Sequence, residues 1–324
     1  SVGLHWTRAM SKIDAKTLKN AYEKARDDLL SERTADGHWV GHLSSSALST
    51  ATAISALAIA HDAPAAEACV ESTKSDQQMI NCGLAYLAAQ QNSDGGWGDT
   101  DLSSSNVATT MLVVAAIRLA GREAAMSQIV TRAEAYIDKL GRVDALRRRY
   151  GRDKTFAVPI LTNTALAGGC DWSEVSPLPF ELACVPQRLY RFMRLPVVSY
   201  AIPALVAIGQ ARHFHRPCRF APWRWLRSAA VPRSLTVLRR MQPASGGYLE
   251  AVPLTSFVVM SLASIGNVDH PVTRDGLRFI RDSYRDDGSW PIDTNLATWN
   301  TTLALNALAG GGEDVARLGI TNWL

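Results

Sequence analysis

Charged residues are scarce in this chain, and its charge is nearly balanced. Asp, Glu, Lys and Arg make up 20% of the 324 residues, and the net charge is only +4. A charge this small does not provide the basic surface that nucleic-acid binding requires, so we expect no nucleic-acid partner. The apolar fraction of 47% instead favours a large buried core.

Cysteines are few, and the common cofactor motifs are missing. The five Cys are odd in number and lack the spacing of a disulfide framework, which favours buried free thiols in a reducing compartment. His213, His215 and Cys218 have no second ligand pair, so we expect no metal site. There is also no Gly-rich phosphate loop, nucleophile elbow or dinucleotide fingerprint. The sequence therefore predicts no cofactor.

No hydrophobic run is long enough to cross a bilayer. The segment Leu195–Gly209 is uncharged and follows several Arg residues, which leaves two interpretations open. It could be a buried core helix, or a monotopic helix with its apolar body in lipid and cations at the headgroups. The second interpretation predicts a peripheral protein at the cytoplasmic face of a membrane. Its membrane-facing residues would be Arg191, Arg194, Val197, Val198 and Ile202.

One short motif that recurs four times is the main positive signal. Each copy, called a cassette below, has Gln or a substitute, then three residues, a Gly, and an aromatic residue two positions later. Such self-similarity is typical of a helical array whose units bury their apolar faces on one another. The copies are Arg33-x3-Gly37-His38-Trp39, Gln91-x3-Gly95-Gly96-Trp97, Gln242-x3-Gly246-Gly247-Tyr248 and Tyr284-x3-Gly288-Ser289-Trp290.

The cassette residues are expected to be structural. The Gly stands where a helix ends and the chain turns, which favours a positive φ. The aromatic ring can cover the end of a helix, and the Gln amide can bind backbone groups left free there. We therefore expect Trp39, Gln91, Trp97, Gln242, Tyr248 and Trp290 to join neighbouring repeats rather than to catalyse.

Helical spacing dominates the chain, and the alternation of a strand never persists. The sequence predicts an all-α protein, with paired helices closed into an α/α barrel. Residues 29–150 hold two cassettes with a helix after each. Residues 151–230 contain many Pro and break the repeat, and residues 231–290 return to it.

The cassettes match the QW motifs of squalene–hopene cyclases and related class II terpene cyclases, and the chain resembles the N-terminal half of such an enzyme. The resemblance continues through residues 171–175 and 178–181, the apolar stretch after Pro196, and residues 288–308. In this family one α/α barrel is inserted into another. The resemblance implies that residues 29–295 form the inserted barrel, while residues 1–28 and 296–324 belong to the interrupted, acid-bearing barrel.

The family starts cyclisation with an Asp-x-Asp-Asp motif that protonates an alkene, and this sequence has no such motif. Asp99-Thr100-Asp101 lacks the third carboxylate and is interpreted as an N-cap pair for the next helix. Asp293, six residues before Trp299, is kept as a weak candidate acid. The resemblance places the missing motif beyond Leu324, so we expect a C-terminal-half polypeptide as a partner.

The remaining candidate residues would line the substrate cavity. Cationic cyclisation needs an aromatic-lined cavity that excludes water. By the resemblance, Trp299 matches a cavity aromatic and Pro253 a proline beside the pocket, whereas Asn163 replaces a cavity Trp. Asn295 completes the candidate substrate-binding set, and ordinary core positions are the alternative interpretation.

Three functions remain open. The preferred one is the N-terminal half of a class II terpene cyclase that acts on squalene or another linear isoprenoid. The second is a non-catalytic, membrane-associated barrel that binds isoprenoids. The third, a protein prenyltransferase β-subunit, would need an Asp, Cys and His zinc set that we do not find. Oligomerisation is left open.

Overall fold

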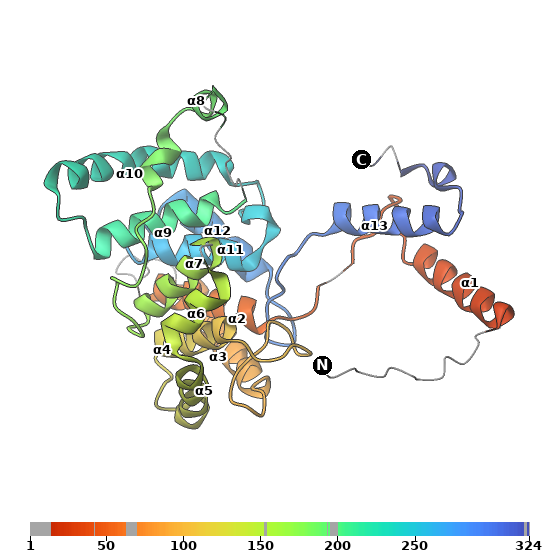
Figure 1. Ribbon diagram of the computed structural model, residues 1–324, viewed down its shortest axis with the longest axis horizontal. Coiled ribbons are helices and arrows are strands. Elements are labelled where there is room, and N and C mark those ends of the chain that lie inside the picture. Colours follow the sequence, from red (N-terminus) through yellow and green to blue (C-terminus); the bar gives the residue numbers. More distant parts are fainter. Residues whose placement is uncertain are drawn as a thin grey trace, which may run out of the picture. The chain divides into compact units, whose positions relative to one another are not determined.

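The protein is helical almost throughout (Figure 1). The computed structural model describes residues 14–41, 43–62, 70–151, 154–192, 194, 200–320 and 323. Within these ranges, β structure is limited to isolated bridges between single residue pairs. The predicted all-α class is confirmed. The chain divides into unit 1, residues 1–42 and 295–324, and unit 2, residues 43–294.

Unit 2 is built around a closed ring of inner helices. Each inner helix packs against the next, and the last returns to the first: α2 with α4, α4 with α7, α7 with α9, α9 with α11, and α11 with α2. A ring of this kind is the inner layer of the predicted α/α barrel. Its members are α2 (Ala47–His61), α4 (Val107–Leu119), α7 (Lys154–Leu166), α9 (Ile202–His215) and α11 (Val252–Ala263).

An outer layer packs against this ring. Its helices have one buried and one exposed face; in α12, for instance, Leu277 and Ile280 are buried while Arg274 and Arg278 point outward. The outer elements are α3 (Val70–Ala89), α5 (Ser127–Leu140), α6 (Arg142–Tyr150), η2 (Phe180–Cys184), α10 (Ala221–Met241), η3 (Tyr248–Glu250) and α12 (Pro271–Asp282). The short helix α8 (Gln187–Phe192) follows η2 in the chain.

The inner helices carry Ser and Thr among their apolar residues, and several of these hydroxyl groups bond to a carbonyl of their own helix. In α2, Ser55 Oγ donates to Ala51 O at 2.9 Å, and Thr52 Oγ1 donates to Ser49 O at 2.9 Å. Hydroxyl groups that return to their own helix can be buried without an external partner. The uncharged Ser- and Thr-rich sequence of α2 is therefore compatible with burial on every side.

Asn106 caps α4, which differs from the prediction that Asp99 and Asp101 form the cap. The Asn106 side chain accepts from Thr109 N at 2.9 Å. Asp99 Oδ1 accepts from Asn106 Nδ2 at 2.9 Å and from Thr109 Oγ1 at 2.5 Å. Asn106 is the cap because it stands directly before the first helical residue. Asp99, in the preceding turn, holds the Asn106 side chain in place.

Unit 1 contains α1 (Ala15–Ser31), α13 (Ala297–Gly310) and η4 (Val315–Leu318). Its small core comprises Trp39, Ala304, Leu308 and Ile320. No residue of α1 is fully buried. Tyr22 Oη of α1 donates to Gly311 O at 3.1 Å, which joins the two segments of unit 1 that are distant in sequence.

The first cassette belongs to unit 1. We predicted that the inserted barrel begins at residue 29, whereas the boundary between the units falls after residue 42. The difference arises because Trp39 packs with α13, whose Thr301 Oγ1 accepts from Trp39 N at 3.0 Å. The assignment of the two units to the two barrels of the family stays a prediction.

The described part of Leu195–Gly209 lies in the core. Helix α9 begins at Ile202 and packs against α7 and α11, and Val206 and Ile208 are fully buried. The interpretation of this part as an exposed apolar helix is therefore wrong. Val197 and Val198 lie outside the described residues. In the part of the chain that the structure describes, no helix is both long enough and apolar enough to span a membrane.

Candidate functional site

The aromatic residues of the four cassettes share one geometry. Each is buried, and its polar group donates to the backbone carbonyl ten residues earlier, in the last turns of the preceding helix. Such a bond satisfies a helix-end carbonyl that would otherwise lose its partner in the protein interior. The bonds are Trp39 Nε1 to Leu29 O at 2.7 Å, Trp97 Nε1 to Leu87 O at 2.8 Å, Tyr248 Oη to Leu238 O at 2.9 Å and Trp290 Nε1 to Ile280 O at 2.7 Å.

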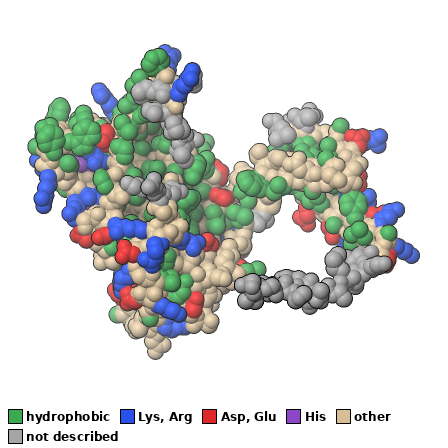
Figure 2. All heavy atoms as spheres, in the orientation of Figure 1, with side chains coloured by type: hydrophobic (Ala, Val, Ile, Leu, Met, Phe, Trp, Pro, Cys, Tyr) green, Lys and Arg blue, Asp and Glu red, His purple; other side chains and the backbone are tan. Residues whose placement is uncertain are grey.

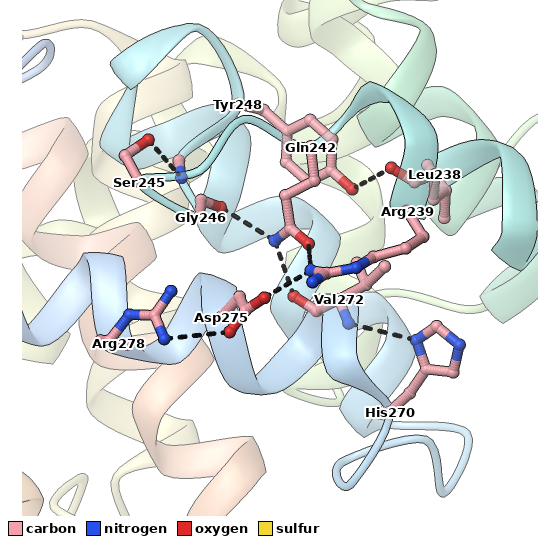
Figure 3. Close-up of polar contacts among 11 residues, drawn as sticks. Leu238, Arg239, Gln242, Ser245, Gly246, Tyr248, His270, Val272, Asp275 and Arg278 are labelled. Atoms are coloured by element: carbon pink, nitrogen blue, oxygen red, sulfur yellow. Dashed lines mark hydrogen bonds and ion pairs between the residues drawn. The ribbon is translucent and has the colours of Figure 1, made fainter.

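The cassette Gln residues link a turn to the next outer helix. Gln242 Nε2 donates to Gly246 O at 2.9 Å and to Val272 O at 3.0 Å, at the start of α12 (Figure 3). Gln91 repeats this pattern with Gly95 O at 2.9 Å and Ile129 O at 3.0 Å. The amide N–H groups thus tie two segments together, and no titratable group takes part in these bonds.

The backbone amide of each cassette aromatic donates to a buried Thr hydroxyl. Trp97 N donates to Thr110 Oγ1 at 3.1 Å, and Tyr248 N donates to Thr255 Oγ1 at 2.9 Å. In both cases the Thr lies in the first turn of the inner helix that follows. Trp290 N instead reaches Thr50 Oγ1 of α2 at 3.1 Å. The cassettes are therefore structural joints, which leaves the chemistry to other residues.

Asp293 lies where the chain leaves unit 2, beside the start of α11. Ala251 and Asp293 form an antiparallel bridge, flanked by bonds from Val252 N to Ile292 O and from Thr294 N to Glu250 O, both 2.9 Å. Pro253 occupies the first turn of α11. The bridge therefore brings Asp293 and Pro253, two of the predicted site residues, to the same edge of the barrel.

The backbone is strained at this edge. Leu249 and Glu250 adopt φ values of 54° and 55°, which residues other than Gly and Asn rarely adopt. The Glu250 side chain accepts from Ser245 Oγ at 2.5 Å, and this bond ties the strained turn to the cassette residues that precede it. The turn after Tyr248 thereby directs the chain from the third cassette into α11 next to Asp293.

The pKa of the Asp293 carboxyl group is shifted in the opposite direction to that of Asp287. Burial raises the pKa of Asp293 above its ordinary value. At Asp287 burial acts in the same direction, but hydrogen bonds from Ser289 and Ser45 outweigh it and lower the pKa. The pKa of Asp293 is thus raised, whereas the pKa values of Asp14, Asp171 and Asp287 are lowered. A carboxyl group held in its protonated form is the species that could deliver a proton.

The other predicted substrate-binding residues are divided between the two units, and Asp293 is not the centre of a cluster of them. Asn163 is fully buried in α7, where its Nδ2 donates to Ser55 Oγ at 3.2 Å. Asn295 and Trp299 belong to unit 1. Asn295 Oδ1 accepts from Ala297 N at 3.1 Å at the start of α13, and Trp299 is 67% exposed. A cavity role for these residues stays a prediction.

Sequence reasoning missed the Thr residues that receive the cassette amides. Thr110 and Thr255 each lie early in the inner helix that follows a cassette, which is a signal that the sequence does contain. Thr50 and Thr301 could not be assigned in this way, because each serves a cassette distant in sequence. The described residues contain no group of three His, Cys, Asp or Glu side chains close enough to hold a metal ion.

Comparison with known proteins places the chain in a family. The model of the squalene-hopene cyclase N-terminal domain matches residues 22–219. A variant of the type II terpene cyclase MstE from Scytonema, bound to its product merosterolic acid A, is 15% identical with a TM-score of 0.31, over 84% of this chain and 82% of that chain. Another variant, bound to its substrate geranylgeranyl dihydroxybenzoate, is 12% identical with a TM-score of 0.32, over 84% and 80%. Curated proteins give no match. Since the family match covers more than half of the residues, the chain belongs to the squalene-hopene cyclase N-terminal domain family.

Proposed function

We propose that this chain is the N-terminal half of a class II terpene cyclase acting on squalene or another linear isoprenoid. Membership of the squalene-hopene cyclase N-terminal domain family supports this proposal. None of the 324 residues forms an Asp-x-Asp-Asp motif, so the proton donor would come from a C-terminal-half polypeptide. The proposed role of this chain is to provide part of the wall of the reaction cavity.

Helix α13 carries this proposal. Its sequence, ATWNTTLALNALAG, has no charged residue and resembles the inner helices of unit 2. Nearly every residue of α2 is buried, whereas α13 leaves Trp299 67% and Leu303 54% exposed. Helix α1 likewise leaves Leu18 exposed. An uncharged helix with a large exposed apolar face is expected to pack against further helices, and the C-terminal half would supply them.

In the assembled enzyme, the chemistry would need a dry cavity and a protonated acid. Exclusion of water keeps a developing carbocation from being quenched, and an aromatic face stabilises the cation through its ring quadrupole. Trp299 is the aromatic that we propose for this role. Asp293 is the second candidate for the acid, because burial favours its protonated form.

The test is reconstitution. The purified chain should leave squalene unchanged, and addition of a C-terminal-half polypeptide with Asp-x-Asp-Asp should yield a cyclised product detectable by gas chromatography and mass spectrometry. Changing the central Asp of that motif to Asn is the control and should abolish the product. Turnover by the isolated chain would contradict the half-enzyme proposal, and Asp293→Asn would then be the decisive variant. An assembled pair that binds squalene without turnover would favour a non-catalytic isoprenoid-binding barrel.

We further propose that the protein associates with a membrane surface through α8 and the start of α10. Phe192, Phe220 and Trp225 are all more than 60% exposed. Figure 2 shows hydrophobic side chains gathered over α8 and over one end of α10, with Lys and Arg beside them. Apolar groups flanked by cations are typical of helices that lie in the interface of an anionic bilayer.

Liposome pelleting tests the membrane proposal. The double variant Phe220→Ser and Trp225→Ser should lose most of its binding to vesicles that contain anionic lipid. Leu102→Ser, which removes an apolar side chain that is 93% exposed on another loop of unit 2, is the matched control and should bind as the unchanged protein does. Equal binding by all three proteins would contradict the proposal.

A further inference from the structure

A groove in unit 2 lies apart from the cassettes and from Asp293. Helices α9 and α10 and the turn after α11 line an open groove of about 430 Å³, a volume within the range of small-molecule sites. Phe214, Val231 and Ile265 contribute apolar walls. Gln210, His213 and Ser228 contribute polar groups, and the exposed Arg224 lies at the rim.

Two polar side chains of the groove lack a complete set of partners. Gln210 is 1% exposed; its Nε2 donates to Ser234 Oγ at 3.0 Å, but its Oε1 has no partner among the described residues. His213 is 8% exposed; its Nε2 lies 3.0 Å from Ser228 Oγ, and its Nδ1 likewise has no described partner. An unsatisfied buried polar group costs about 1–3 kcal/mol, so both atoms favour a guest that can bond to them.

Pro232 removes one backbone donor from the wall of the groove. It lies inside α10 and has no backbone N–H, so it cannot donate to the Ser228 carbonyl one turn earlier. Ser228 and Pro232 both line the groove. Gln210 is therefore accompanied in the groove lining by a helix turn that lacks one backbone hydrogen bond.

The protonation state of His213 limits the chemistry of a guest. Burial lowers the pKa of His213, and the nearby Arg227 acts in the same direction, so the ring is neutral at pH 7. In a neutral imidazole, the free Nδ1 is either a donor or an acceptor, depending on the tautomer. A hydroxyl group can donate to Gln210 Oε1 and can serve either form of His213. An ether or ketone can only accept, and would leave Gln210 Oε1 unpaired.

We propose that this groove binds an apolar molecule that carries a hydroxyl group, with the hydroxyl at Gln210 and His213 and the apolar body against Phe214, Val231 and Ile265. A cationic guest is disfavoured, because Arg224 lies at the rim and none of the described residues that line the groove is acidic. Both unpaired atoms are buried, so the Gln210 and His213 side chains have to rotate before the hydroxyl can bond to them. This inference does not depend on the proposed cyclase function.

Phenol and fluorobenzene form a suitable pair of probes, because they are similar in size and only phenol donates a hydrogen bond. We expect saturation-transfer NMR on the full chain to give a dissociation constant for phenol at least about fivefold lower than for fluorobenzene, as expected for one hydrogen bond. Gln210→Leu should remove this preference. Gln128→Leu changes an exposed Gln on α5 and is the matched control, which should keep it.

A second variant separates loss of the hydrogen bond from loss of the fold. Ile265→Trp should fill the groove and abolish binding of both probes, while the circular-dichroism spectrum stays helical. Equal binding of phenol and fluorobenzene would overturn the proposal. An unchanged preference in Gln210→Leu would also overturn it, because phenol would then bind without Gln210. The absence of phenol binding up to its solubility limit would overturn it as well and would indicate that the groove holds water only.

Discussion

The backbone amide of Trp290 donates to Thr50 Oγ1 at 3.1 Å, across 240 residues of sequence. The next helix in the sequence after Trp290 is α13, yet Trp290 bonds to α2. Trp39 shows the converse, since it is followed by α2 and bonds to Thr301 of α13. The first and last cassettes have thus exchanged their inner helices. This exchange closes the ring of unit 2 and leaves α1, Trp39 and α13 together in unit 1.

Thr50→Val should destabilise unit 2. The substitution keeps the shape of the side chain but removes the acceptor of the buried Trp290 amide. We expect a loss of about 1–3 kcal/mol in the free energy of unfolding, measured by urea denaturation followed by Trp fluorescence. Thr131→Val, on the exposed face of α5, is the control and should change this energy by less than about 0.5 kcal/mol. An equal effect of both variants would contradict the role of the Trp290–Thr50 bond.

Gln242→Leu should also lower stability, because Gly246 O and Val272 O would both lose a donor. The expected loss is about 1–3 kcal/mol in the free energy of unfolding. Gln242→Glu should cost at least as much, since a carboxylate would then face two carbonyl oxygens. Gln78→Leu, at an exposed position of α3, controls for the gain in hydrophobicity. Unchanged urea midpoints in both Gln242 variants would contradict this prediction.

Asp293→Asn should stabilise the protein at neutral pH and have little effect in acid. Burial raises the folded-state pKa of Asp293, so the folded state binds more protons than the unfolded state between the two pKa values. Stability from this group is therefore highest below the unfolded value of about 3.9, and it falls as pH rises through the folded value. The gain from Asn should grow over the same window in urea unfolding at several pH values.

The control for this pH series is Asp286→Asn, which changes an exposed carboxyl group in the neighbouring turn. An effect of Asp286→Asn that grows with pH in the same way would show that the pH dependence is not specific to Asp293. A stabilisation by Asp293→Asn that is constant from acid to neutral pH would show that burial does not govern the titration of Asp293.

Trp299→Ala should leave folding of the isolated chain almost unchanged, because the side chain is 67% exposed in unit 1. In a reconstituted cyclase, the same variant should raise the share of incompletely cyclised products. Loss of an aromatic face next to a developing cation is worth about 1–2 kcal/mol. Product profiles by mass spectrometry check this prediction, with Leu303→Ala on the same exposed face as the control. An unchanged profile would place Trp299 outside the cavity.

Local signals in the sequence were sufficient for the helices and the cassette turns. The cassette glycines Gly37, Gly95, Gly246 and Gly288 have φ between 83° and 90°, as the motif predicts. A Cβ at Gly246 would lie 2.3 Å from Asp275 O, which explains why the position is glycine. Such features depend on a few adjacent residues, so they can be predicted without knowledge of the tertiary structure.

The apolar pattern of the chain was not sufficient to tell a core helix from a surface helix. The uncharged segment that ends at Gly209 suggested a lipid-facing helix, yet its described part is covered by α7 and α11. Three exposed aromatic side chains, Phe220, Trp223 and Trp225, lie instead at the charged start of α10. Hydrophobicity along one segment cannot show which neighbours cover it.

The sequence by itself determined the all-α class, the positions of the cassette turns and the family to which the chain belongs, because each of these depends on residues close together along the chain. Only the tertiary structure decided that Trp290 pairs with Thr50 and Trp39 with Thr301. It also decided that Asp293 lies beside α11 and that Gln210 and His213 share one groove. These pairings join segments far apart in sequence, and they arise from the closure of the helical ring, which no local pattern encodes.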